Sequence, residues 1–515
     1  MSSSAEAMSG TGAATTPAVG PPRRTIFVQA HAQYRGVVLG VARGLKTKFD
    51  AEISLYVANA EQQAHYRRID TQGLFSDIVV NDLLYRACAE EVPDRAKARA
   101  EAREHEKFLG VTINELSMSD RHLGRGYSLA GIFHPRSVVS ERTDYDGLLN
   151  GFNRQIAFWR NEFETKKPCL AINIGKVPSV VARRMGVPTR RFTASRYRNL
   201  CYWAENEFLE SPEIAEAFAR LPESAGLDIT EPAEGYLQAR GLIRPGLAFA
   251  GMAKNVATIV AQRCYWRLRG FSKGRMYFAR DEVRMIWRQY REMRRWKRQA
   301  KAGLRDLEVA EFVFFPLHVE PEAALHTLSP EFFFQLETIA STARDLPAGV
   351  MLAIKEHIAA MGRRPSEFID QLASFKNVVL IDPDVRGIDV VRRARALVTI
   401  TSSAGFEAAA IGKPVVTFGQ RNTFNFLPHV RVVRDAAELK AGLDYALGEA
   451  FDAGRARRDG RRFLAAIAAC SFDLGTFNYL KPDIVEDATV DQAMETLLRS
   501  IERSGRPGPL ACPAA

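Results

Sequence analysis

Short apolar runs alternate with longer amphipathic stretches in two separate parts of the chain. Apolar runs of roughly four to eight residues between turn residues are typical of buried strands, and apolar residues spaced three or four apart are typical of helices. The first part contains predicted strands at 25–30, 52–57, 169–174 and 188–192, with helices at 37–46 and 178–185. The second contains predicted strands at 312–315, 350–354, 378–381, 397–400 and 415–418, with helices near 331–343, 366–373 and 389–394.

This alternation predicts an α/β protein with two doubly wound, Rossmann-like domains that face one another. Strands that are apolar throughout need helices on both faces of their sheet, and helices between strands make the strands parallel. A charged helical stretch over 83–160 is expected to form an insertion in the first domain. The expected divisions are a disordered tail (1–23), an N-terminal domain (24–230), a basic helical connecting segment (231–304), a C-terminal domain (305–435), C-terminal helices (436–503) and a second tail (504–515).

Length and composition agree with two soluble domains. A chain of 515 residues is too long for one core, and its 46% hydrophobic and 25% charged content is ordinary for globular proteins. Its six cysteines form no C-x-x-C pair, which disfavours a zinc ribbon or a disulfide framework. We expect a cytoplasmic protein, because 1–20 lacks the features of a secretory signal and no apolar run is long enough to span a bilayer.

The positive charge is concentrated in one segment. The formal net charge is +11, and the segment 263–301 contains 14 basic residues against 3 acidic ones. Apolar side chains recur there at helical spacing, and arginines occupy the other faces, which predicts a basic amphipathic helix. Such a helix suits an anionic membrane surface, contacted by Arg284, Arg288 and Arg291, or else packs its apolar stripe on its own domain. Nucleic acid is disfavoured, because no recognisable reading module accompanies the helix.

The segment 397–418 predicts a site for an anion. A strand at 397–400 is followed by a hydroxyl-rich turn, a helix that Gly412 ends, and another strand at 415–418. A helix N-terminus offers unpaired N–H groups and partial positive charge. We therefore expect Ser402, Ser403 and Gly405 to bind a phosphate, and Glu407, one turn later, to contact a ribose hydroxyl. The alternative is that Ser402 or Ser403 only caps the helix and Gly405 only makes the turn.

Other unusual polar residues also follow predicted strands. Such residues should meet where a doubly wound domain binds its ligands, at the carboxyl ends of the strands. The turn after the first strand lacks G-x-G-x-x-G, so a dinucleotide cofactor and hydride transfer are disfavoured. The candidates are His31 and Arg35 after the first strand, His318 and Glu322 after 312–315, and Lys355, His357, Arg363 or Arg364 after 350–354.

These segments resemble the bacterial capsule polysaccharide biosynthesis family, glycosyltransferases of GT-B architecture that include the β-Kdo transferases. The resemblance rests on 315–322, on Lys355-Glu356-His357 with Gly362-Arg363-Arg364-Pro365, and on 401–419, and it extends to 195–206 in the first domain. It implies an acceptor-side N-terminal domain, a nucleotide-sugar-binding C-terminal domain and a CMP-activated acidic sugar, with CMP-Kdo as the leading donor. The chain departs from the pattern at Ile358, where the family usually has proline.

The resemblance also implies roles for individual residues. His357 would contact the donor phosphate beside Ser402 and Ser403, and Glu322 aligns with an aspartate of the family's retaining enzymes, which makes it a candidate nucleophile. From the residues alone, basic groups must stabilise the leaving phosphate, and Lys355, His357 and Arg363 or Arg364 suit that task. His318 is a candidate contact to the donor, with a structural hydrogen bond across the cleft as its alternative. His31 is a candidate base or donor contact with a structural alternative, and Arg35 and Arg196 are candidates for an anionic acceptor.

The expected function is transfer of a sugar from a nucleotide donor to a lipid-linked or oligosaccharide acceptor at the inner membrane, alongside other capsule assembly proteins. No metal and no cofactor are expected, because no D-x-D pair lies in a suitable strand-end context. Two alternatives remain open: a UDP-sugar 2-epimerase, which shares the two facing domains, and a non-catalytic glycan-assembly protein, which Ile358 keeps possible.

Overall fold

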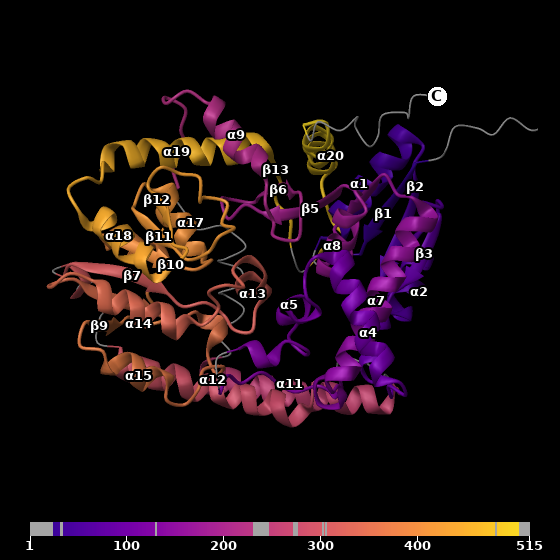
Figure 1. Cartoon of the computed structure of the whole chain (residues 1–515), viewed down its shortest axis with the longest axis horizontal. Coiled ribbons are helices and arrows are strands. Elements are labelled where there is room, and N and C mark those ends of the chain that lie inside the picture. The colour runs from indigo at the N-terminus through magenta and orange to yellow at the C-terminus, as the bar shows by residue number, and fades with distance from the viewer. Residues whose placement is uncertain are drawn as a thin grey trace, which may run out of the picture.

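A computed structural model describes residues 24–30, 34–128, 131–229, 247–270, 277–300, 303, 306–308, 310–478 and 481–503 of the chain. Two α/β domains, each built on its own sheet, lie side by side (Figure 1). This confirms the predicted pair of Rossmann-like domains. Among the described helices, none combines the length and the apolar character needed to cross a bilayer.

The N-terminal domain contains a seven-stranded sheet in the described part of the chain, with the order β13-β6-β5-β4-β1-β2-β3. Strands β1 to β5 are parallel, whereas β6 and β13 run antiparallel to their neighbours. Its strands are β1 (Thr25–Gln29), β2 (Glu52–Val57), β3 (Asp77–Val80), β4 (Leu170–Ile172), β5 (Thr189–Ala194), β6 (Leu200–Ala204) and β13 (Ser471–Asp473). The helices α1 (Arg35–Phe49), α2 (Ala60–Ile69), α8 (Lys176–Arg184) and α9 (Pro212–Arg220) connect or flank them.

The predicted helical insertion is confirmed between β3 and β4. Its longest helix is capped at both ends: the Asp144 side chain accepts from the Gly147 N–H at 2.8 Å, and Lys167 ends the helix in the left-handed region at φ 44°. The apolar side of this helix packs against β1 and β2 through Trp159 and Phe163. The insertion consists of α3 (Leu83–Cys88), α4 (Arg95–Leu109), α5 (Ile113–Met118), η1 (Arg125–Tyr127), α6 (Val138–Arg142) and α7 (Tyr145–Lys166).

The C-terminal domain contains a six-stranded, fully parallel sheet in the described residues, with the order β12-β11-β10-β7-β8-β9. Every residue of β7 is buried, and alternate side chains enter different cores: Phe312 and Phe314 on one face, Val313 and Phe315 on the other. The strands are β7 (Phe312–Pro316), β8 (Met351–Lys355), β9 (Val378–Leu380), β10 (Ala396–Thr399), β11 (Val415–Thr417) and β12 (Val430–Val432). The helices are η3 (Asp306–Glu308), α13 (Ala323–Leu328), α14 (Gln335–Asp345), η4 (Ile358–Ala360), α15 (Phe368–Ser374), α16 (Gly387–Arg393), α17 (Ser403–Ala410) and α18 (Ala436–Leu447).

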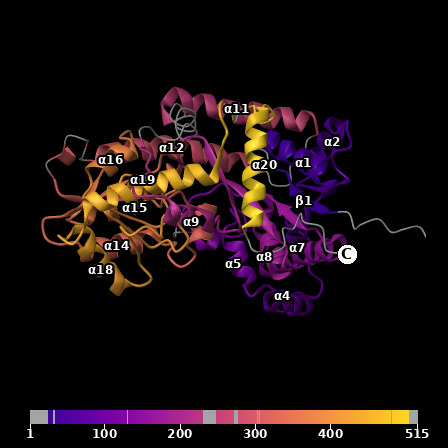
Figure 2. The same cartoon turned by 90° about the horizontal axis from the view of Figure 1, so that it is seen from above.

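The C-terminal part of the chain returns to the N-terminal domain. Helix α19 (Ala453–Cys470) packs on α9 and α17, β13 adds to the N-terminal sheet, and α20 (Asp487–Glu502) lies against α1 (Figure 2). We expected only helices over 436–503, so the strand β13 is a correction. It is three residues long and lies at a sheet edge, where a short run gives little periodic signal.

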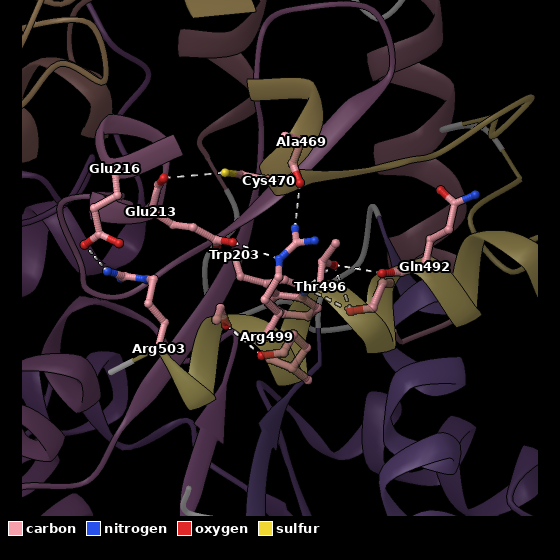
Figure 3. A network of polar contacts seen from close by, with 12 residues as sticks. Trp203, Glu213, Glu216, Ala469, Cys470, Gln492, Thr496, Arg499 and Arg503 are labelled. Atoms are coloured by element: carbon pink, nitrogen blue, oxygen red, sulfur yellow. Dashed lines mark hydrogen bonds and ion pairs between the residues drawn. The ribbon is translucent and has the colours of Figure 1, made fainter. Parts of the chain in front are cut away.

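Polar contacts fix this returning segment, as Figure 3 shows. Arg499 of α20 forms an ion pair with Glu213 of α9 at 2.9 Å and donates to the Ala469 carbonyl at 2.7 Å. Trp203 of β6 donates from its indole N–H to the Ala493 carbonyl at 3.0 Å. These contacts join α9, the end of α19, α20 and the N-terminal sheet.

The connecting segment contains the helices α11 (Phe249–Leu268) and α12 (Ala279–Gln299), which pack on one another. The predicted amphipathic helix is α12, and its apolar stripe packs on its own domain, as one of our two alternatives expected. Met293 and Trp296 lie in the C-terminal core, and the Trp296 indole donates to the Ile381 carbonyl at 2.9 Å. Trp287, in contrast, is 47% exposed.

Candidate active site

The strand order of the C-terminal sheet reverses between β7 and β10. At this switch point the two following loops diverge to opposite faces of the sheet, which is where doubly wound domains bind their ligands. The two loops contact each other directly, because the Thr401 N–H donates to Nε2 of His318 at 2.8 Å. The segments singled out from the sequence, 317–322 and 400–405, are therefore neighbours.

His318 fastens these two loops together. Besides accepting from Thr401, its ring approaches Oε1 of Gln335 through Nδ1 at 3.3 Å, and the same oxygen accepts from the His318 backbone N–H at 2.6 Å. Burial of the ring lowers the pKa of His318 to about 3, so the ring is neutral at pH 7. Both ring nitrogens are engaged within the protein. The donor contact expected of His318 is corrected to its alternative, a structural hydrogen bond.

Arg364 is also corrected, because its guanidinium is fully buried behind the site. It pairs with Glu356 through Nε at 2.7 Å and lies 3.8 Å from Glu320, and it donates to the His318 carbonyl. Burial acts against the positive charge, but Glu356 and Glu320 hold the pKa of Arg364 above its usual value. The side chain positions the loops after β7 and β8 and cannot reach a ligand in this structure.

His357 differs from His318 in leaving one ring nitrogen available. Its Nδ1 accepts from the Ala359 N–H at 3.2 Å, which places the proton on Nε2, and its ring is solvent-exposed. Its backbone N–H donates to Oε1 of Glu356 at 2.8 Å, so the buried pair with Arg364 holds this loop. Desolvation by the surrounding protein is the larger cause, and the positive charge of Lys355 the second, that lower the pKa of His357 to about 4. The residue is therefore a neutral N–H donor at pH 7.

Two other residues of this loop have defined surroundings. Lys355 is buried at the end of β8, and its ammonium donates to the Glu356 carbonyl at 3.3 Å. Ile358, which stands where the family pattern has proline, takes the first position of the turn η4. Proline is well accepted at the first position of a helical turn, so the departure changes little in the geometry around His357.

The start of α17 has the geometry of an anion site, although one serine is occupied. The Ser402 hydroxyl caps the helix by accepting from the Gly405 N–H at 3.2 Å, and it lies 2.7 Å from Oγ1 of Thr399. Ser403 is exposed in the first turn of α17. A side chain on Gly405 would meet Phe424 and Thr399 at 2.9 Å, so packing accounts for this glycine. Backbone N–H groups of the first turn and the Ser403 hydroxyl are left to hold an anion.

Arginines of both domains surround Glu322. Burial raises the pKa of Glu322, and the positive charges of Arg121, Arg196 and Arg363 oppose that rise. Arg363 bonds through Nη1 to Nδ1 of His134 at 3.1 Å, which joins the C-terminal domain to the insertion. Arg196 lies in the turn between β5 and β6, and its guanidinium has no hydrogen bond or ion pair within the described residues.

The positive charge of Arg196 also acts on Glu407 of α17. Burial raises the pKa of Glu407 to about 7, while Arg196 and Arg392 lower it and Asp389 raises it. A carboxyl group of this kind changes its charge near neutral pH.

We expect Glu407→Gln to remove a pH dependence of stability. The pKa of Glu407 is raised from 4.5 to about 7 in the folded state, so folded wild type holds a proton more tightly than the unfolded chain and loses stability as pH rises through this window. The variant should gain roughly 2 to 3 kcal/mol relative to wild type between pH 4.5 and pH 7.5. Chemical denaturation at both pH values measures this, with Glu449→Gln at an exposed site as control; parallel curves would contradict it.

Other predicted site residues lie apart from this group. His31 is outside the described residues. Arg35 forms an ion pair with Asp483, so its predicted role at an anionic acceptor is corrected. On α12, Arg288 donates to the carbonyls of Gly362 and Arg364 at 2.7 and 2.6 Å, which makes it a packing residue. Arg284 and Arg291 are exposed.

The sequence reasoning missed Arg121 altogether. This residue belongs to the insertion, about 200 positions before Glu322, and no motif marks it. Glu320, Glu356 and Gln335 were also missed as positioning residues. A charged residue inside the predicted loop 317–322 was the available signal for Glu320.

Residues 251–426 match the family model described as capsule polysaccharide biosynthesis protein. This segment, which is less than half of the chain, is similar to the capsule polysaccharide biosynthesis family. The match includes Glu322, His357 and the start of α17 but not Arg121 or Arg196. Among curated proteins, no significant match to this chain was found.

Several solved structures are similar to this chain at low identity. The calicheamicin glycosyltransferase CalG4 is 12% identical, with 94% of this chain and 99% of CalG4 covered and a TM-score of 0.29. MurG from Acinetobacter baumannii is 10% identical (87% and 99% covered, TM-score 0.27), as is the UDP-GlcNAc 2-epimerase from Neisseria meningitidis (92% and 100% covered, TM-score 0.27). At these TM-scores the fold assignment rests on the two observed sheets, and we draw no functional conclusion from the likenesses.

Proposed function

We propose that the chain is a nucleotide-sugar-dependent glycosyltransferase that builds a capsule or related surface polysaccharide. The observation that carries this proposal is the contact between the β7 loop and the start of α17, where Thr401 donates to His318 at 2.8 Å. It brings an open helix N-terminus to the switch point of a Rossmann-type sheet. Departure of a nucleotide phosphate needs hydrogen-bond donors at this place.

His357 is the proposed donor to the leaving phosphate. Its Nε2 carries the proton because Nδ1 accepts from Ala359, and this N–H has no hydrogen-bond partner within the described residues. Its loop is linked through Glu356 and Arg364 to the carbonyl of His318. The neutral ring supplies a hydrogen bond without depending on its own protonation near pH 7. The first-turn N–H groups of α17 and the Ser403 hydroxyl complete the set of donors, and Glu407 is the proposed ribose contact. The proposal needs no metal ion and no cofactor.

An acidic sugar is the proposed donor, with CMP-Kdo as the leading candidate. Arg196 supports this, because it is half-buried and has no hydrogen-bond or ion-pair partner within the described residues. A half-buried guanidinium without a partner favours binding of an anionic group. The carboxylate of an acidic sugar would be this anionic group. Glu322 is the proposed nucleophile beside it. The proposed acceptor is lipid-linked or a growing oligosaccharide.

A panel of CMP, CDP, UDP and GDP in thermal unfolding tests this proposal. We expect CMP to stabilise the chain most, by about 2.7 kcal/mol at 100 times its dissociation constant, and cytidine to have little effect because it lacks the phosphate. His357→Ala should reduce the CMP effect, whereas His65→Ala, at a residue of α2 in the other domain, should not. No response to any nucleotide would favour a non-catalytic assembly protein. A response to UDP with acceptor-independent turnover of a UDP-sugar would favour an epimerase.

A further inference from the structure

The helices α11 and α12 form one edge of the molecule, opposite the edge that α9 and α19 form (Figure 1). Helix α12 is anchored by Met293 and Trp296 in the C-terminal core. Helix α11, in contrast, is hardly buried in the protein. All twenty of its residues are described, and among them only Met252 is buried. Its outer face is therefore available for a contact outside the chain.

Apolar residues recur every three or four positions along this outer face of α11. Phe249 is 63% exposed, Val260 53% and Leu268 86%, and Ala253, Ala257 and Cys264 are also exposed. Residues at this spacing share one side of a helix. A contiguous exposed apolar stripe marks an interaction surface, because isolated exposed residues are common but such stripes are not.

Aromatic side chains extend this stripe onto α12. The Phe249 and Tyr290 rings lie 6.0 Å apart, and those of Tyr290 and Trp287 lie 5.9 Å apart. Amphipathic rings of this kind are favoured at the boundary between water and the apolar part of a bilayer. Beside them, a groove of about 840 Å³ runs between α12 and α15, with Arg291 and Arg298 among its lining residues.

The charges around the stripe are positive. The acidic residues of the two helices are compensated: Asp281 pairs with Arg136, Glu282 pairs with Arg263, and burial raises the pKa of Glu292 to about 8. Several cations, in contrast, have no carboxylate partner within the described residues. They are Lys254, Arg267, Arg284, Arg291, Arg294 and Arg298.

We propose that the outer face of α11 and α12 is a docking surface for an anionic lipid bilayer. The apolar stripe and the aromatic rings enter the headgroup boundary, and the surrounding arginines bind lipid phosphates. A second copy of the chain is the less suitable occupant, because a two-fold contact would bring the same uncompensated cations against each other. The sequence suggested that the stripe of α12 makes this contact. The structure assigns it to α11 together with the exposed Trp287 of α12, since Ile286 and Met293 of the α12 stripe are buried.

Vesicle flotation with the full-length chain tests the docking surface. We expect the chain to float with vesicles of phosphatidylcholine and phosphatidylglycerol but not with phosphatidylcholine alone. The pair Arg291→Glu and Arg298→Glu should weaken binding about thirtyfold or more, because each basic residue near an anionic surface contributes about a factor of five. The pair Val260→Glu and Leu268→Glu should weaken it at least about tenfold.

Matched substitutions elsewhere on the surface serve as controls. Arg457→Glu with Arg458→Glu changes exposed arginines of α19 on the opposite edge, and Ile484→Glu changes an apolar residue that is 67% exposed; both should float like wild type. Failure of wild type to float with anionic vesicles would overturn the proposal. Flotation of both test variants at the wild-type level would overturn it as well. A dimer that the Val260 and Leu268 pair dissociates, without vesicle binding by wild type, would assign the stripe to a second copy. Flotation requires no turnover, so its outcome is independent of the proposed glycosyl transfer.

Discussion

Replacement of Arg364 by methionine is expected to lower the free energy of unfolding by about 3 to 5 kcal/mol. The side chains of Arg364, Glu356 and Glu320 are all 0% exposed, so removal of the guanidinium leaves buried carboxylates without their counter-charge. The variant also loses the bond to the His318 carbonyl that connects this pair to the β7 loop. Urea unfolding followed by circular dichroism measures the loss.

An exposed arginine provides the matched control for Arg364→Met. Arg344 pairs with Asp345 at 2.7 Å but is 62% exposed, and Arg344→Met should cost less than about 1 kcal/mol. Addition of Glu356→Gln to Arg364→Met should restore part of the stability, because it removes one uncompensated charge. Equal losses in Arg364→Met and Arg344→Met would show that the buried group does not hold the site in place.

Glu322→Gln is expected to reduce sugar transfer on the order of a thousandfold or more and to leave nucleotide binding within about twofold of wild type. An amide is a poor nucleophile toward an anomeric carbon, whereas the nucleotide would be bound by α17 and His357. Product formation by mass spectrometry, with CMP affinity measured in parallel, separates the two effects. Glu337→Gln, at an exposed residue of α14, is the control and should behave as wild type.

The opposite result for Glu322→Gln has a definite meaning. Transfer at a wild-type rate would remove Glu322 from the chemistry. Its carboxylate would then serve to hold Arg121, Arg196 and Arg363 near one another. Loss of CMP binding together with transfer would instead indicate that the substitution disturbs the site as a whole.

The central strands could be predicted because burial on both faces makes them apolar throughout, as in β7, β10 and β11. The strands β3, β6, β12 and β13 were missed. Three of them are three or four residues of mixed polarity at a sheet edge, which carry little pattern. The strand β6 is apolar and five residues long, and its pattern was overlooked. The end of α17 was expected nearly as observed, since Gly412 is a strong stop signal. The helix begins at Ser403, three residues before the expected start at Phe406, because Ser402 caps it.

The site could be predicted in its position but not in the orientation of its side chains. Residues after strands meet at a sheet edge, so the proximity of 317–322 to 400–405 follows from topology. Whether a histidine faces a ligand or the protein depends on partners distant in sequence: Gln335 and Thr401 occupy His318, whereas Ala359 leaves one nitrogen of His357 free. For the same reason, Arg363 and Arg364 are adjacent in sequence but lie in different surroundings.

The wild-type chain in the same transfer assay tests the central claim most directly. Incubation with CMP-activated acidic sugars and a panel of lipid-linked and oligosaccharide acceptors should release CMP only when an acceptor is present and should add one sugar mass to that acceptor. Binding of CMP without any acceptor-dependent transfer, across the whole panel, would contradict the proposed glycosyltransferase.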